Sequence, residues 1–177
     1  MNLQEILIRT AAQTGEDMLD DEARMLAVGY IAEAYEEMML IYAPYIDIAA
    51  LMPQDGILPR EELGARAGRI VRVMARGMER PFDTVGEGVY VPGCGGAEAV
   101  FRCKHIPKPL TQDGDESELP QTYSGALADY ASYRLMQGGG KARQQRGDAY
   151  YSRYLQRKAM LAPCSQTYRE RLNRKYG

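Results

Sequence analysis

The sequence predicts a mainly α fold with a β insertion: a small helical bundle with an antiparallel β hairpin or meander between its N-terminal and C-terminal helices. Apolar residues recur at helical spacing near both ends, and they alternate in the strand manner among glycines in the middle. A chain of 177 residues fits one domain. We expect a single domain over 1–177 with four parts: N-terminal helices at 1–45, a β-rich insertion with Gly-rich loops at 46–110, a C-terminal helical pair at 119–161, and a basic tail at 162–177.

Two helices are predicted before residue 45. The first begins at a capping box formed by Asn2 and Glu5, and its apolar face follows directly. The second is predicted over 22–43, because acids crowd its start, where they favour the helix dipole, and Pro44 ends it. The apolar residues of the two helices are Leu3, Ile6 and Leu7 in the first, and Val28, Ile31, Tyr35, Met38 and Tyr42 in the second, with Met25 and Met39 beside them.

The middle of the chain has strand character. Residues 46–52 and 69–75 alternate apolar and polar side chains, and 59–66 predicts a single helical turn between them. Three further short runs, PFDTV, GVYV and AEAVFRCKHI, are separated by glycines, which is typical of a hairpin or meander. The following segment, 111–118, is predicted to be an acidic, turn-rich linker.

Helical periodicity returns after Pro120 and breaks at Gly138–Gly140. The second helix of this pair is predicted from Lys141 to Leu161, before Pro163. The predicted faces are Tyr123, Ala126, Leu127, Tyr130, Ala131 and Arg134 with Tyr133 adjoining, and then Ala142, Gln145, Ala149, Tyr150, Tyr154, Arg157 and Leu161.

Tyrosine and charge are unevenly used. Thirteen Tyr stand against two Phe and no Trp, so Tyr either fills half-buried positions around a core or serves surfaces that are buried only in an assembly. Residues 1–62 hold 13 acids and 3 bases, whereas 134–177 hold 2 acids and 11 bases. The basic end therefore fits nucleic acid, an acidic protein surface such as that of a neighbouring copy, or acids of the same subunit.

No membrane partner is expected, because the longest uncharged apolar-rich stretch, MMLIYAPYI, is far shorter than the roughly twenty residues that a spanning helix needs. The N-terminus lacks the pattern of a signal peptide. The three cysteines, Cys94, Cys103 and Cys164, are therefore predicted to be free thiols.

Catalytic, metal-binding and cofactor-binding residues are not expected. His105 is the only histidine, and its spacing from Cys94 and Cys103 matches no usual zinc site. The GGGK at 138–141 follows a helix instead of a strand and lacks the Ser or Thr of a phosphate loop, and GEG at 86–88 lacks a third glycine. The sequence predicts that the protein is not an enzyme.

A set of residues around the helical pair resembles a known family. A linker ending in Leu-Pro is followed by a Tyr, a helix reading ALADYASYRL, a glycine break and a second helix carrying AYYSRY. This arrangement is similar to that of tailed-bacteriophage head–tail connector (adaptor) proteins, over 20–161 in architecture and over 97–155 in sequence. The residues that carry the resemblance are Leu119, Pro120, Tyr123, Ala126, Leu127, Tyr130, Tyr133, Tyr150 and Tyr154.

The resemblance implies a structural subunit of a phage or prophage, made in the bacterial host cytoplasm and located in the virion neck. It implies a homo-oligomeric ring of about a dozen copies below the portal protein, joining the DNA-filled head to the tail. Its partners would be itself, the portal, and a head-closure or tail protein, with non-specific DNA contact in the lumen. The segment implied to face the portal is Pro163–Gly177, with Tyr168, Arg169, Arg171, Arg174, Lys175 and Tyr176.

Two alternatives stay open at this point. The chain could be a nucleic-acid-binding helical protein that uses its basic, Tyr-rich C-terminus to hold a phosphate backbone and stack bases. It could also be another neck or tail-completion protein of a phage. The glycine-rich stretch at 86–96 and the triple glycine depart from the connector pattern. This departure affects the expectation of how the β loops are ordered and not the class of protein.

Overall fold

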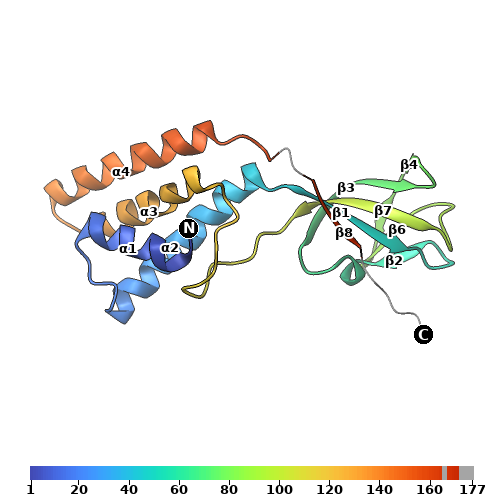
Figure 1. The fold of residues 1–177 in the computed structure, drawn as a ribbon, viewed down its shortest axis with the longest axis horizontal. Helices are drawn as coiled ribbons and strands as arrows, with labels where there is room; N and C mark the ends of the chain where they lie inside the picture. Colours follow the sequence, from blue (N-terminus) through green and yellow to red (C-terminus); the bar gives the residue numbers. More distant parts are fainter. Residues whose placement is uncertain (165–166, 172–177) are drawn as a thin grey trace. The chain divides into compact units, whose positions relative to one another are not determined.

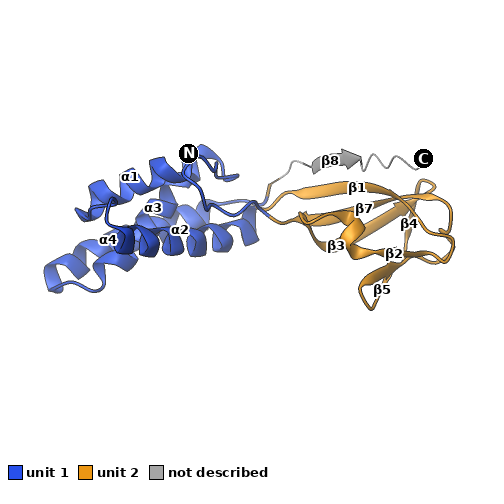
Figure 2. Cartoon of the chain, turned by 90° about the horizontal axis from the view of Figure 1, so that it is seen from below, with its two compact units in different colours: residues 1–42, 107–163 blue, residues 43–106, 164–177 orange. Residues whose placement is uncertain are grey.

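The computed structural model describes residues 1–164 and 167–171 (Figure 1). The chain divides into two compact units (Figure 2): unit 1 is Met1–Tyr42 with Pro107–Pro163, and unit 2 is Ala43–Ile106 with the chain from Cys164 onward. The predicted fold class, mainly α with a β insertion, is confirmed. The elements are α1 (Leu3–Thr14), α2 (Asp21–Tyr42), β1 (Tyr45–Leu51), β2 (Ile57–Pro59), the 3-10 turn η1 (Arg60–Leu63), β3 (Ala67–Ala75), β4 (Met78–Arg80), β5 (Asp83–Val85), β6 (Gly88–Tyr90), β7 (Glu98–His105), α3 (Gln121–Met136), α4 (Lys141–Met160) and β8 (Thr167–Arg171).

Unit 1 is a bundle of the four helices, with α3 packed against each of the others. Ala126, Leu127, Tyr130 and Ala131 of the predicted face are buried, and so is every other residue from Ser124 to Ser132, so the buried surface extends all round this part of the helix. The run contains Ser, Gly and Ala at most positions, and such small side chains let neighbouring helices approach from several sides. Because Ser, Gly and Ala differ little in hydrophobicity, the periodicity of the sequence does not show that all sides of this segment are buried.

The N-terminal helices follow the prediction closely. The side chain of Asn2 accepts from the backbone of Glu5, and the side chain of Glu5 accepts from the backbone of Asn2, which completes the capping box. In α2 the predicted stripe is largely buried, whereas Met25 is 69% exposed. The buried residues of these helices include Leu3, Ile6, Leu7, Ile31, Tyr35, Met38 and Met39.

The prediction for the inward face of α4 is wrong in its first half and correct at its end. Ala142, Gln145 and Ala149 are exposed and Gly147 is buried instead, whereas the predicted Tyr154 and Leu161 are buried. A Cβ at Gly147 would lie 3.1 Å from the Cβ of Met136, so glycine permits the close approach of α3 and α4. A search for apolar spacing does not detect a buried glycine.

The predicted acidic linker is an ordered loop of unit 1. Backbone bonds from Leu3 to Asp115 and from Gln4 to Asp113 join it to the start of α1. The carboxylate of Asp115 is 6% exposed and accepts hydrogen bonds from the Lys108 side chain at 2.6 Å and from the backbone of Thr111 and Gln112. The bond from Lys108, followed by those from Gln112 and Thr111, holds the pKa of Asp115 well below its usual range.

Unit 2 contains two sheets with their own hydrophobic core. Five strands form one sheet in the order β4-β3-β7-β1-β8, and three form the other in the order β2-β6-β5. The described pairs are antiparallel except β1 with β8, which is parallel. The inward residues of β1 alternate as predicted, and those of β7, which was predicted only as a short strand, alternate too. The core includes Ile46, Ile48, Leu58, Val73, Val89, Phe101 and Cys103. The insertion is therefore larger than a hairpin or meander.

Strand β3 is irregular. Its pairing with β7 shifts register twice, between Ala67 and Ile70 and between Ile70 and Arg72. Buried residues consequently recur at 67, 70, 73 and 75 instead of at every second position. Each shift turns two successive residues outward, as β-bulges do.

Within the described residues, no helix combines the length and the apolar character that crossing a bilayer requires.

Replacing Asp115 with Asn should lower the melting temperature at pH 7, because the amide cannot reproduce the charged hydrogen bonds that anchor the loop. An unfolded Asp titrates near pH 3.9 and the folded group titrates lower, so this contribution is present above about pH 4 and is lost as the pH falls further. The melting-temperature difference between Asp115→Asn and the wild type should therefore narrow between about pH 4 and pH 2.

The matched control is Glu116→Gln, an exposed carboxylate in the same loop. Its melting temperature should equal that of the wild type at every pH tested. If the melting-temperature difference between Asp115→Asn and the wild type were as large at pH 2 as at pH 7, the charged Asp115 would not be what anchors the loop.

Candidate assembly surfaces

The tyrosines of the helical pair form a continuous set of ring contacts inside unit 1. Tyr130 lies 5.0 Å from Tyr154, and Tyr133 stacks on Tyr151 at 4.4 Å between ring centroids. At the other end of the pair, the Tyr123 hydroxyl donates to the carbonyl of Met160 at 3.0 Å. These rings hold α3 to α4, which matches the reading of Tyr as filler of half-buried positions.

The polar tips of two of these tyrosines reach carboxylates on α2. Tyr130 donates to Glu33 at 2.7 Å, and Tyr154 donates to Glu37. The bond from Lys158, followed by that from Tyr154, lowers the pKa of Glu37. Burial, followed by the neighbouring Glu37, raises the pKa of Tyr154, so its hydroxyl keeps its proton and remains a donor.

A buried carboxylate lies at the centre of the bundle. Asp129 of α3 is 0% exposed and accepts from Arg153 at 2.9 Å and Arg157 at 3.0 Å, both on α4, and from Gln13 of α1 at 2.9 Å. A Cβ at Gly125, one turn earlier, would lie 2.9 Å from Nη1 of Arg157. Glycine there leaves the room that the guanidinium needs.

Most of the basic charge of α4 is directed inward. Arg143 pairs with Glu16 and Lys158 with Glu37, in addition to the two arginines on Asp129. The basic helix is thus largely neutralised by acids of the same subunit, one of the three partners left open by the sequence. This disfavours a nucleic-acid site on α4, because four of its six cations are already engaged.

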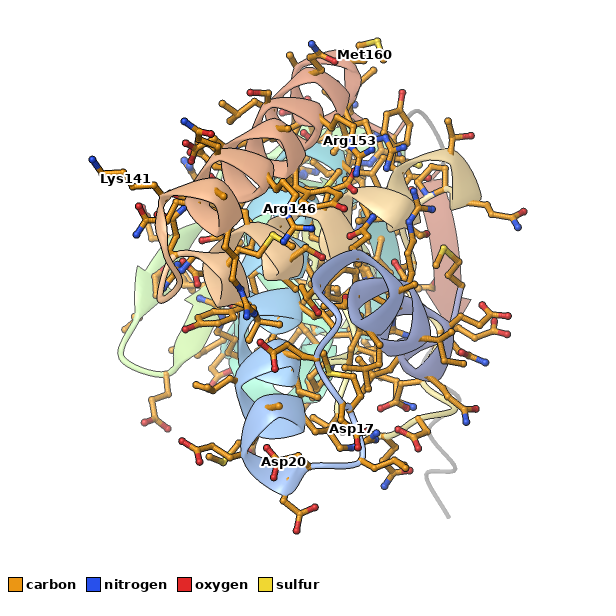
Figure 3. The ribbon with its side chains drawn as sticks, turned by 90° about the vertical axis from the view of Figure 1, so that its left-hand side faces the viewer. Asp17, Asp20, Lys141, Arg146, Arg153 and Met160 are labelled. Atoms are coloured by element: carbon orange, nitrogen blue, oxygen red, sulfur yellow. The ribbon has the colours of Figure 1, made fainter. Side chains whose placement is uncertain are left out.

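Some charge of unit 1 has no ion-pair partner. Among the described residues, no carboxylate pairs with Lys141 or Arg146 of α4. The exposed acids Asp17 and Asp20 of the α1–α2 turn and Asp21 and Glu22 of the first turn of α2 form no ion pair within the described residues either, although Asp17 and Asp20 accept hydrogen bonds from backbone N–H groups. Figure 3 shows Lys141 at the upper left and Arg146 near the middle of the view, with Asp17 and Asp20 at the bottom. Two apolar side chains near these acids in sequence are also exposed, Leu19 of the turn at 90% and Met25 of α2 at 69%.

The residues of the predicted basic tail fall partly within strand β8. The backbone of Tyr168 pairs with Ile46, that of Arg169 with Asp47, and that of Arg171 with Ala49. The sequence predicted no strand here. Arg174, Lys175 and Tyr176 lie outside the described residues.

The remaining residues of the resemblance lie within unit 1. Leu119, Ala126 and Leu127 are buried, Pro120 lies at the start of α3, and the Tyr150 hydroxyl donates to the Gln13 carbonyl at 3.4 Å. These residues build the bundle, so the outward surface of the pair consists of other residues.

The side chains of unit 2 that could take part in chemistry or bind a ligand lie in its core or in a shallow groove. Burial raises the pKa of the Cys103 thiol to about 11, and Nε2 of His105 lies 2.8 Å from Nη2 of Arg66. No group of three or more His, Cys, Asp or Glu side chains in the described part of the chain is placed to hold a metal ion. A groove of about 650 Å³ offers two carboxylates and one guanidinium, and it is lined by Pro59, Arg60, Glu61, Gly64, Ala65, Ala67, Gly86 and Glu87.

No protein-family model matches the chain, and no curated protein sequence matches it.

Asp129 was missed by the sequence analysis, although a signal existed. It is the one acid between 121 and 136, it stands among small residues, and the next helix is rich in arginine. A lone acid in a helix of small residues is predicted to be buried, and a buried charge must be paired, so the arginines of the next helix are its expected partners.

Replacing Asp129 with Asn should lower the free energy of unfolding by about 2 kcal/mol, because two arginines and Gln13 lose their charged acceptor. The two arginines are 49% and 30% exposed and can rehydrate, which keeps the loss below that of a fully buried pair. Urea denaturation measures it. The control Glu36→Gln, on the exposed side of α2, should stay within about 0.5 kcal/mol. Equal stability of the two variants would contradict the role of Asp129.

Proposed function

We propose that the protein is a structural, non-enzymatic subunit of a phage or prophage head–tail connector, which forms a ring below the portal in the virion neck. The observation that carries the proposal is exposed charge of both signs on unit 1 that has no ion-pair partner. Among the described residues, no ion pair joins the acids Asp17, Asp20, Asp21 and Glu22 to the bases Lys141 and Arg146 within one copy (Figure 3). Contact between unlike surfaces of successive copies closes into a ring when the rotation permits.

Two features support this reading. Leu19 of the turn and Met25 of α2, both exposed and near the acids in sequence, would supply apolar area to such a contact. The second is the resemblance of the helical pair to connector proteins. It adds the portal and a head-closure or tail protein as partners. Another neck or tail-completion protein shares these features, and the copy number and portal binding distinguish the two.

The first test is the absolute mass of the purified protein by light scattering, alone and with the portal encoded beside it. We expect a ring-sized mass, or a portal complex that gains many copies. Reversing two acids in Asp21→Lys/Glu22→Lys should leave a folded monomer, because like charges then face each other across the contact. A control reversal at two other exposed acids, Glu36→Lys/Glu116→Lys, should assemble as the wild type does.

Charge reversal on the other side gives the complementary test. Lys141→Glu/Arg146→Glu alone should also fail to assemble, and mixing it with Asp21→Lys/Glu22→Lys should restore the ring, since each reversed surface then meets an opposite one. A wild-type protein that stays monomeric and ignores the portal would contradict the proposed function. Failure of the mixture alone would contradict only this contact.

Deleting Cys164–Gly177 should leave a folded protein that does not attach to the portal. The antiparallel core of unit 2, β4-β3-β7-β1, does not include the deleted strand, so circular dichroism and melting should stay close to those of the wild type. Co-sedimentation with the portal measures the attachment. If the truncated chain attached to the portal normally, the tail would not be part of the portal contact.

A further inference from the structure

One segment of unit 2 carries a dense row of arginines. Residues 66–80 contain Arg66, Arg69, Arg72, Arg76 and Arg80 and a single acid, Glu79. They span the whole of β3, the turn of the β3–β4 hairpin and β4, which is the edge strand of its sheet (Figure 1). The first four of these arginines are exposed.

The two register shifts of β3 are what bring these arginines to one side. Residues three apart point to opposite faces of a regular strand. In β3 each shift turns two successive residues outward, so Arg69 and Arg72 are both exposed while Ile70 and Val73 are buried between them. The bulges therefore convert a three-residue arginine spacing into one basic surface.

The hairpin tip holds a further arginine in an unfavourable conformation. Arg76 has φ 52° and Gly77 has φ 74°, the pattern of a two-residue type I′ turn, where Asn, Asp or Gly is preferred at the first position. Left-handed backbone costs a residue of this kind on the order of 1 kcal/mol. The tip of the hairpin therefore carries a cation at a position where Asn would fit the left-handed backbone better.

Neighbouring strand β7 extends the positive charge. Arg102 lies directly opposite Arg72, and like charges in that position repel. Each is balanced by one carboxylate, Arg102 by Asp47 at 2.7 Å and Arg72 by Glu79 at 3.0 Å. Among the described residues, Arg69, Arg76 and Lys104 have no carboxylate partner, so their charge is available to a ligand.

We infer that this side of the five-stranded sheet binds the phosphate backbone of double-stranded DNA, with Arg69 and Arg76 as principal contacts and Arg72 and Lys104 beside them. Arginines without a base-reading element give contacts that position the duplex but do not select its sequence. A duplex fits better than a single strand, because residues 66–80 contain no aromatic side chain on which an unpaired base could stack.

Five acids of unit 2 lie away from the five-stranded sheet. Asp55, Glu61, Glu62, Asp83 and Glu87 belong to the second sheet, its turns and η1, which would repel the same polyanion. The five-stranded sheet itself contains Asp47 and Glu79, which pair with Arg102 and Arg72, and also Glu98 and Glu170. The inference does not depend on ring formation, since a monomer presents the same hairpin.

The test measures the affinity of the full chain for a fluorescent 30-bp duplex by anisotropy between 50 and 200 mM NaCl. We expect micromolar binding at the low-salt end and a linear fall of log K with log salt. Neutralising two contacts in Arg69→Gln/Arg76→Asn should reduce the slope by about 1.8, because each lost phosphate contact removes about 0.9. Arg76→Asn improves the turn residue, so the melting temperature should not fall.

The matched control is Arg9→Gln/Arg24→Gln, which removes the same charge from α1 and α2, outside this surface and without changing the acids or bases of the proposed contact between copies. Its slope should equal that of the wild type, with the mass of every variant checked in the same buffer. An equal loss in both variants, a loss in the control variant alone, tighter binding of a single strand, or no duplex binding at 50 mM NaCl would each overturn the inference. So would a hairpin variant that keeps its DNA affinity and loses the portal, which would assign the surface to an acidic protein.

Discussion

The buried carboxylate of Asp129 constrains the whole helical unit. A charge without solvent is tolerated only with several donors around it, and here they come from both α1 and α4. That requirement places α3 in the middle of the bundle and selects small residues along it. It also turns the arginines of α4 inward. The tyrosine contacts and the α2 carboxylates then complete a polar layer that runs through the unit.

Local signals were sufficient for much of the fold. The capping box at Asn2, the length of α2 and the alternation in β1 and β7 each depend on neighbours in sequence, so the pattern predicts them. The first half of the inward face of α4 was not predictable by the same route, because its buried residue is Gly147 and its ion pair is made by an arginine, Arg143. Likewise nothing local in 111–118 shows that Asp115 binds a lysine and two backbone amides.

Charge totals proved a poor guide to where charge is available. The C-terminal block holds the largest excess of bases, yet those on α4 mostly face acids of the same unit. The β insertion has no such excess, but its irregular strand exposes arginines that have few partners. Pairing within the fold decides which cations a ligand can reach, and only tertiary structure determines that pairing. The candidate surfaces on both units therefore could not be derived from composition.

The order of the units along the chain has a consequence for biosynthesis. Residues 43–106, with seven of the eight strands described, leave the ribosome before α3 exists, whereas α1 and α2 lack their central packing partner until synthesis has passed residue 136. The 94 residues from the end of α2 at Tyr42 to the end of α3 at Met136 take roughly 5–19 s at about 5–20 residues per second. The apolar faces of the first two helices are uncovered during that interval, and chaperones that bind nascent chains have their opportunity there.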